Sequence, residues 1–348
     1  SVTLLTSQKV SHSLLVKDGS HHPPRSLQLG AYFMRGYMRG YMRGSRIVSR
    51  IMWNRNGHTN LNHCDLGNLG VDLDCHGILA DVGGVVNLYR IERPAVINFS
   101  GGRSSGFMLW NILQAYDGKL PKDIKVIFCN TGLEHHETYE FIHRIEENWC
   151  PVTWLEYALT EEGKASYAQV QYETASRKGE PFTKLIAKKK YLPNPVARIC
   201  TVNMKITTVQ KYMRHVYDWM SCIGLRADEQ RRVSKLRSRV DPPLMPMADA
   251  GHSKRDVHAF WNDHPLDLKL PLDSNIFGNC VGCFLKGYGK LEAIAREEPW
   301  QLDWWIRQEQ ESGATFVKDR PDYKTIKRDA HLQQAFDFGD TIDCFCTD

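Results

Sequence analysis

Ala95-Val-Ile-Asn-Phe-Ser-Gly-Gly-Arg-Ser-Ser-Gly106 joins an apolar run to a loop of small residues, and residues 107–116 follow with apolar positions at helical spacing. Val96, Ile97 and Phe99 carry the β-branched and aromatic side chains that favour a buried strand. Beyond the loop, apolar residues recur every three or four positions, which indicates an amphipathic helix. The segment therefore predicts a strand, a tight loop and a helix in succession.

The loop of this unit has the composition of an anion-binding turn. Gly101 and Gly102 let the backbone turn sharply or approach a ligand closely, and we expect Ser100, Ser104 and Ser105 to cap the helix. The first amides of a helix and the positive end of its dipole hold phosphate or sulfate. The loop lacks the Gly-Lys-Ser/Thr ending of a Walker A motif. A plain structural turn is the alternative interpretation.

Strands and helices alternate after this loop. Further strands are predicted at 125–132, 152–157 and 219–223, with a helix at 133–148. Such alternation gives a mostly parallel sheet with right-handed crossovers, and ligands bind such sheets beyond the carboxyl ends of the strands. We therefore predict an α/β, doubly wound, Rossmann-like domain in which the loops after the first two strands line one cleft.

A charged cluster follows the last predicted strand. Arg226, Glu229 and Arg232 come shortly after Gly224. The planar guanidinium group of arginine suits phosphate and sulfate. At a strand end opposite the glycine loop, the cluster would complete an anion pocket. The alternative is a solvated helix face.

Other segments are predicted with less chemistry. Residues 160–195 are polar and lysine-rich, which favours a solvated helix and loop over a lid, and a helix is expected from about 205 to 217. Ser253–Asp256 is typical of a capping box at a helix start. A further helix at 299–312 carries three tryptophans that we expect in the core, namely Trp300, Trp304 and Trp305.

The first 91 residues differ from the rest of the chain. They repeat Met-Arg-Gly-Tyr in tandem from residue 34, a pattern that supports neither helix nor strand. The net charge is +5 overall and +7 in residues 1–50, so the remainder carries −2. We predict three parts: an irregular or disordered extension at 1–91, a nucleotide-binding α/β domain at 92–265, and a cysteine-bearing helical region at 266–348.

Several of these features occur together, in one order, in a known family. The segments that carry the resemblance are Ser100–Gly106, Asn130–Gly132, Glu137-Thr138, Gly224–Arg226, Glu229, Arg232 and Asn279–Phe284. Over about residues 93–348 the chain resembles the phosphoadenosine phosphosulfate reductase family of the adenine nucleotide α-hydrolase superfamily, and in particular its cysteine-rich bacterial and phage members.

The resemblance implies an adenine nucleotide, either phosphoadenosine phosphosulfate or ATP, and a set of residues that bind it. The loop would hold its phosphate or sulfate, the arginine cluster would complete the anion pocket, and the turn after the second strand would lie near the ribose or phosphate. The implied nucleotide-binding residues are Ser100, Gly101, Gly102, Arg103, Ser104, Ser105, Asn130, Thr131, Gly132, Arg226, Glu229 and Arg232.

The chain contains ten cysteines, and their pattern argues against a disulfide framework. Cys280-x-x-Cys283 places two thiols within reach of one metal ion, and Cys200 and Cys344 could complete a ligand set for a 4Fe–4S cluster or for zinc. The resemblance favours iron–sulfur over zinc. The alternatives are a redox pair and buried small residues. We expect three further cysteines in the core: Cys129, Cys150 and Cys222.

The first predicted function is sulfonucleotide reduction or a related sulfur transfer. A thiolate of Cys344 or Cys346 would attack the sulfuryl sulfur while Arg226 stabilises the leaving phosphate, and a thioredoxin-like protein would supply electrons. The chain departs from the family here, because assimilatory reductases end in Glu-Cys-Gly-Leu-His and this chain does not.

Two other functions are open from the sequence. One is an ATP pyrophosphatase-type thiolation of tRNA or DNA, although such enzymes usually carry Asp where this loop has Ser104. The other is a non-catalytic nucleotide or metal sensor. No apolar run reaches membrane-spanning length, and the first 16 residues show no signal-peptide pattern. We therefore expect a cytoplasmic protein with no membrane contact.

Overall fold

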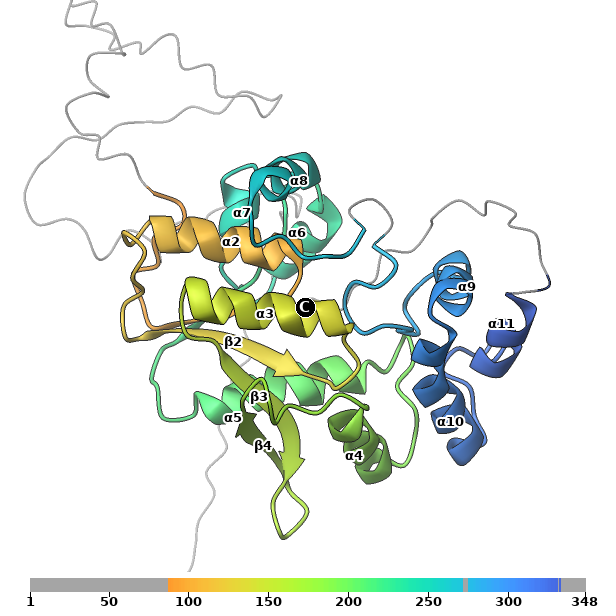
Figure 1. Ribbon diagram of the computed structural model, residues 1–348. Helices are drawn as coiled ribbons and strands as arrows, with labels where there is room; N and C mark the ends of the chain where they lie inside the picture. The colour runs from red at the N-terminus through yellow and green to blue at the C-terminus, as the bar shows by residue number, and fades with distance from the viewer. Residues whose placement is uncertain (1–86, 272–274, 331, 333–348) are drawn as a thin grey trace, which may run out of the picture. The chain divides into compact units, whose positions relative to one another are not determined.

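A five-stranded sheet in the order β4-β3-β2-β1-β5 organises the computed structural model, which describes residues 87–271, 275–330 and 332 (Figure 1). Its strands are β1 (Ala95–Asn98), β2 (Ile124–Asn130), β3 (Thr153–Leu159), β4 (Ala165–Val170) and β5 (Met220–Cys222). The first three and β5 run parallel, with β1 paired to β2 and to β5. The predicted α/β, mostly parallel fold is confirmed.

Helices cover both faces of the sheet, as a doubly wound fold requires. On one face α2 (Arg103–Gln114) and α3 (His136–Asn148) pack their apolar sides on the strands (Figure 1). On the other face Val209 and Met213 lie against Val96, Ile127 and Leu155. The strands are therefore buried on both sides, which explains why the first three residues of β1 are all apolar.

The start of α2 differs from the expectation of a serine cap. The capping position is Gly102, and no side chain caps the helix. Instead, Ser105 Oγ donates to the Gly102 carbonyl at 2.9 Å, and the Ser100 amide donates to Ser105 Oγ at 3.2 Å. The serines thus brace the loop, and the first amides of the helix are left to other partners.

The predicted helix at 205–217 is also different in the structure. A π-helix, η1 (Thr201–Thr207), precedes the short α5 (Thr208–Tyr212). The π-helix makes hydrogen bonds one residue longer than those of an α-helix, a geometry that is rare and often found at functional sites. It continues directly into α5, whose Val209 lies on the sheet.

The polar region 160–195 was expected to be a solvated helix and loop, and this is wrong in part. It contains β4, which pairs antiparallel with β3 from Ala165 opposite Leu159 to Val170 opposite Trp154. The helix α4 (Glu180–Lys189) follows, and its Phe182 and Leu185 are buried. An antiparallel edge strand needs only a short turn from its neighbour, so no crossover helix marks it in the sequence.

The remaining helices follow β5. They are α6 (Gln230–Arg237), α7 (Pro246–Asp249), α8 (Lys254–Asp263), α9 (Tyr288–Glu297), the 3₁₀ helix η2 (Pro299–Leu302), α10 (Asp303–Ser312) and α11 (Tyr323–Asp329). The predicted capping box at Ser253 and Asp256 is confirmed. A second core surrounds Trp305, with Trp304 buried in it. Trp300, however, is 60% exposed, so its predicted core position is wrong.

Some predictions lie outside the described residues. These are the irregular extension, except for its last five positions, and the terminal cysteines Cys344 and Cys346. The three-part division of the chain remains a prediction. Within the described ranges, none of the helices combines the length and the apolar character needed to cross a membrane.

Candidate functional site

The loop after β1 is held in one conformation by close packing. Gly101 has φ +74°, and a Cβ atom there would lie 2.7 Å from side-chain atoms of Ile142 and Thr138 on α3. Only glycine meets both conditions. At the end of β5, a Cβ on Gly224 would lie 3.2 Å from the Ser105 Cα. The backbones after β1 and β5 therefore run side by side at the carboxyl edge of the sheet.

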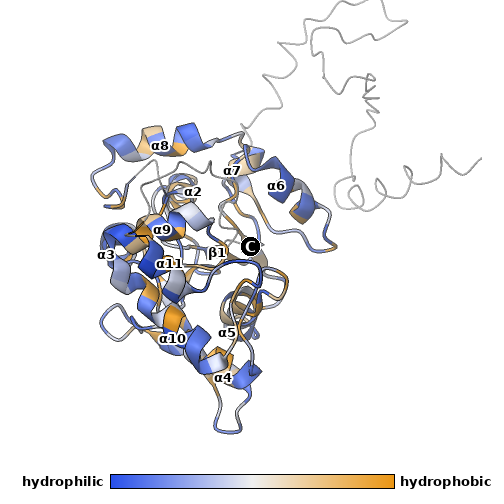
Figure 2. Ribbon diagram, turned by 90° about the vertical axis from the view of Figure 1, so that its right-hand side faces the viewer, coloured by the Kyte–Doolittle hydropathy of each residue, from blue (hydrophilic) through white to orange (hydrophobic). Residues whose placement is uncertain are grey.

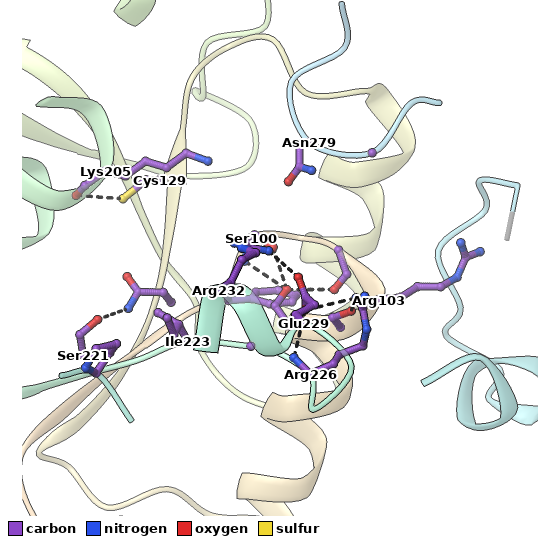
Figure 3. Close-up of a pocket in the computed structure, with 18 of the residues that line it drawn as sticks. Ser100, Arg103, Cys129, Lys205, Ser221, Ile223, Arg226, Glu229, Arg232 and Asn279 are labelled. Carbon is purple, nitrogen blue, oxygen red and sulfur yellow. Dashed lines mark hydrogen bonds and ion pairs between the residues drawn. The ribbon is translucent and has the colours of Figure 1, made fainter. Parts of the chain in front are cut away.

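A cleft of about 840 Å³ opens at this edge (Figure 3). Its walls come from the β1 loop, the ends of β2 and β5, the π-helix η1, α6 and the segment before α9. Its lining includes seven Lys or Arg residues and four Asp or Glu residues. A cleft of this size and charge fits an anionic ligand as large as a nucleotide.

The arginine cluster lies beside the loop between β1 and α2, and its role in binding an anion remains a prediction. Arg226 Nη1 donates to Ser104 Oγ at 3.2 Å. Glu229 accepts from the Arg226 backbone amide at 3.0 Å and pairs with Arg232 Nη1 at 2.5 Å. The same carboxylate thus orients both guanidinium groups, and Figure 3 shows all three side chains beside Ser100.

Arg103 belongs to the same loop but faces elsewhere. Its guanidinium makes a bidentate pair with Asp267, with Nε–Oδ1 at 2.7 Å and Nη2–Oδ2 at 2.8 Å. The same group also donates to the carbonyls of Leu268 and Leu270. These bonds use the planar donor fork, so Arg103 ties the segment after α8 to the start of α2.

The predicted residues after β2 do not line the large cleft. Asn130 is fully buried and donates to Glu156 Oε1 at 2.7 Å, while its Oδ1 accepts from the Gly132 amide at 2.9 Å. Thr131 Oγ1 donates to Glu134 Oε1 at 2.8 Å. The structure therefore gives the side chains of Asn130 and Thr131 partners in the buried interior, and it is Glu134 that reaches the cleft.

Three of the four predicted metal ligands come together beside the cleft. Cys200, Cys280 and Cys283 line one cavity of about 10 Å³, although Cys200 lies 80 positions before Cys280 in the chain. Cys280 Sγ is 3.3 Å from Thr131 Oγ1 and 3.8 Å from Glu134 Oε1. Val281 N donates to the Leu133 carbonyl at 2.8 Å, which holds this loop against the end of β2.

The metal prediction gains no support from this arrangement. Within the described part of the chain, no group of three or more His, Cys, Asp or Glu side chains is placed to hold a metal ion. The fourth predicted ligand, Cys344, lies outside that part. Iron–sulfur and zinc therefore remain predictions, and the chemistry below uses neither.

Lys205 was missed by the sequence analysis and lines both cavities. It is carried by η1, five residues after Cys200, and its carbonyl accepts from Cys129 Sγ at 3.9 Å. In Figure 3 its side chain enters the cleft opposite the arginine cluster, and Asn279 lies on a third side. The sequence gives only a weak signal for Lys205. Its segment was predicted as an ordinary helix with 3.6 residues per turn, and that period assigns the side chains of a π-helix to the wrong faces.

Burial raises the thiol pKa of each of the three cysteines that were expected in the core. Burial raises the pKa of Cys129 and of Cys150 to about 12. It also raises the pKa of Cys222, which is fully buried. Cys129 is the exception in position, because it lines the cleft. Its thiol is nevertheless held in the protonated, unreactive form.

Comparison with known proteins identifies related sequences. Residues 94–241 match the model of the phosphoadenosine phosphosulfate reductase domain. The chain is 29% identical over 214 residues to an uncharacterized nin region protein of Escherichia phage lambda, an alignment that covers 58% of this chain and 70% of the phage protein. It is 28% identical over 243 residues to an uncharacterized protein of Methanocaldococcus jannaschii, covering 64% of this chain but only 43% of that protein.

Proposed function

We propose that this chain is an adenine-nucleotide-binding enzyme of sulfonucleotide reduction or a related sulfur transfer, because residues 94–241 match the model of the phosphoadenosine phosphosulfate reductase domain. The observation that carries the proposal is the contact between Arg226 and Ser104. It brings together two segments that lie 122 positions apart in the sequence, and we propose that an anion binds where they meet. The nucleotide would lie in the cleft, with its sulfate or phosphate over the loop.

The anion would be held by two kinds of donor. The amides that open α2 are not capped by a side chain, and they lie at the positive end of the helix dipole. Arg226 and Arg232 would add charge-assisted hydrogen bonds from the other wall. Glu229 would keep both guanidinium groups in place, at the cost of part of their positive charge.

In the proposed reduction, a cysteine thiolate attacks the sulfuryl sulfur. The bond between that sulfur and the phosphate oxygen breaks, and the phosphate leaves with the electron pair, stabilised by Arg226. The resulting S-sulfocysteine is attacked by a second thiolate, which releases sulfite and forms a disulfide. A thioredoxin-like dithiol reduces that disulfide. Cys344 and Cys346 are the proposed nucleophiles.

Cys200, Cys280 and Cys283 line a small cavity beside the cleft in which the nucleotide would lie, and this placement of three thiols favours sulfur chemistry in the proposal. Lys205 lies between this cavity and the cleft. A lysine ammonium at that position would lower the energy of a nearby thiolate and also attract the transferred sulfate. We propose it as a residue of the reaction site.

Two measurements test the proposal. Isothermal titration with phosphoadenosine phosphosulfate, its 3′-dephospho form and ATP should show binding of at least one nucleotide, and sulfite release should require a dithiol. A Cys344→Ala/Cys346→Ala variant should bind nucleotide normally but release no sulfite. Full sulfite release by that variant would remove both cysteines as nucleophiles. Absence of binding by all three nucleotides would overturn the proposal itself.

The predicted metal group needs a separate experiment. Anaerobic purification followed by an ultraviolet–visible spectrum and iron, sulfide and zinc analysis decides among a 4Fe–4S cluster, zinc and free thiols. A Cys280→Ser/Cys283→Ser variant should lose any metal that these thiols hold. A metal content that is unchanged in this variant would contradict the predicted ligand set.

A further inference from the structure

The cleft carries more positive charge than the anion site at the loop uses. Arg226 and Arg232 share the carboxylate of Glu229 next to the loop. Arg239 and Lys254 also line the cleft, and both are exposed. They come from the segment after α6 and from the first turn of α8. Cationic side chains therefore continue from the floor of the cleft out to its rim.

The helix α6 extends this charge over the adjoining surface. Arg231 and Lys235 are exposed and four residues apart, so they lie on one side of the helix. Arg239, two residues beyond the end of α6, lines the cleft and completes a basic row with these two side chains. Arg237, by contrast, is paired with Asp249 at 2.5 Å. Figure 2 shows α6 as a largely hydrophilic helix.

The loop that follows α6 has an apolar side chain at its tip. Val240 is wholly exposed, although its neighbours Arg239 and Asp241 both line the cleft. Pro242 and Pro243 come next and restrict the backbone of the loop. A fully solvated valine between charged residues gains nothing from folding. Such a position suits contact with an apolar surface that arrives with a charged partner.

We propose that α6 and the loop after it dock a single-stranded nucleic acid whose base enters the cleft. Arg231, Lys235 and Arg239 would contact successive phosphates. Val240 would pack on a base face, as apolar side chains do when they hold bases apart. The volume of the cleft, about 840 Å³, lies in the upper part of the range of ligand sites, ~300–1,000 Å³, and accommodates more than a small anion.

This surface fits a nucleic acid better than an acidic protein. A polyanionic polypeptide would satisfy the basic row, but it would use neither the exposed valine nor a deep cleft with an anion site at its floor. A nucleic acid offers phosphates, apolar base faces and a group that can be turned out of a stack into a pocket. The inference goes beyond the proposed nucleotide chemistry and is tested without turnover.

The test is a binding titration with the full chain. The basic N-terminal residues also attract a polyanion, so the comparison of variants, and not binding by the parent chain alone, locates the contact. Fluorescence anisotropy would use a labelled single-stranded DNA and the matching RNA of about 20 nucleotides, longer than the ~4–16 that one site covers. The variant is Arg231→Glu/Lys235→Glu. The matched control is Lys184→Glu/Lys188→Glu, which reverses two exposed lysines at the same spacing on α4.

The expected result is at least a roughly tenfold loss of affinity in the α6 variant at low salt, with a decrease of about 0.7 per lost contact in the slope of log K against log salt. The α4 control should bind as the parent does. Equal binding by all three proteins, or an equal loss in both variants, would overturn the proposal. A polyglutamate peptide that binds α6 while neither oligonucleotide does would replace it with an acidic protein partner.

A second variant separates apolar contact from charge. Val240→Ser should weaken binding of the oligonucleotide severalfold and leave the salt slope unchanged, because no counterion is released by an apolar contact. Thermal unfolding and nucleotide titration of each variant show whether the fold and the anion site survive. Unchanged affinity in Val240→Ser would remove the base contact from the proposal.

Discussion

Arg226 connects the two walls of the proposed anion site, and its loss should weaken the binding of every ligand that places an anion there. A charge-assisted hydrogen bond contributes about 1.5–3 kcal/mol, or roughly 10–100-fold in affinity. We therefore expect Arg226→Met to raise the nucleotide dissociation constant by about that factor. Isothermal titration with the nucleotide that the parent chain binds best provides the measurement.

The control for this prediction is Arg237→Met. Arg237 is the last residue of α6, eleven positions after Arg226, but it pairs with Asp249 and does not line the cleft. It should bind nucleotide like the parent chain. An equal loss of affinity in both variants would mean that the effect of Arg226 comes through the fold around α6 and not through the ligand.

The thiols of Cys129, Cys150 and Cys222 should resist alkylation in the native protein. Burial raises the pKa of each, so the nucleophilic thiolate is scarce at pH 8. Mass spectrometry after brief iodoacetamide treatment should find these three unmodified, whereas treatment in urea should modify them fully. Rapid labelling of Cys129 without urea would show that the cleft opens more than its packing indicates.

At the scale of one element, the loop after β1 should tolerate substitution of Gly101 far less well than its sequence suggests. Gly101 and Gly118 both have positive φ, but a Cβ would clash only at Gly101. We expect Gly118→Ala to cost about 1 kcal/mol from backbone strain alone. Gly101→Ala should cost a further ~1–3 kcal/mol from overpacking. Urea unfolding of the two variants measures the difference, and equal losses would contradict the packing argument.

Parallel elements could be predicted from the sequence, and two special elements could not. β1, β2, β3 and β5 were predicted as strands that alternate with helices, and their parallel direction followed from that alternation. β4 consists of half-buried residues such as Ser166 together with the exposed Gln169, and these give no apolar run. The π-helix was read as part of an ordinary helix, because seven residues are too few to reveal a different period.

In the candidate site, too, some residues could be predicted from the sequence and others could not. Arg226, Glu229 and Arg232 could be predicted because a strand end and a glycine loop meet at one edge of the sheet. The side chain of Arg103 could not, since its partner Asp267 is 164 positions away. Asn130 was predicted at the ligand because its position in the chain fits, but the partners that turn it inward are contacts of the folded core.

At the scale of the whole molecule, stability should fall in mild acid through His264. Its ring stacks on Phe260 with centroids 4.9 Å apart and contacts Trp110 and Trp149 edge-on. Burial among these rings lowers the pKa of His264 below 6.5. As the pH falls through about 6.5, the unfolded chain therefore binds the proton before the folded protein does, and the free energy of unfolding decreases.

The prediction is a smaller pH effect in His264→Phe. This variant keeps an aromatic ring in the cluster but removes the titrating group. The difference in unfolding free energy between pH 7.5 and pH 5.5, measured with urea, should shrink relative to the parent chain. His215→Phe, on an exposed loop, controls for the loss of a histidine. An unchanged difference in His264→Phe would assign the acid sensitivity to other groups.

The cleft is completed by residues beyond the part of the chain that matches the family model. That match ends at residue 241, whereas Lys254, His258, Gly278, Asn279 and Lys290 also form the walls. The bridge from Leu133 to Val281 joins the two parts at the end of β2. Genetic exchange that moved only the matched segment between genomes would leave out the walls of the cleft that these later residues form. The segment needed to build this site is thus longer than the segment that matches the family model, and a fragment cloned to residue 241 would contain the loop but not the whole cleft.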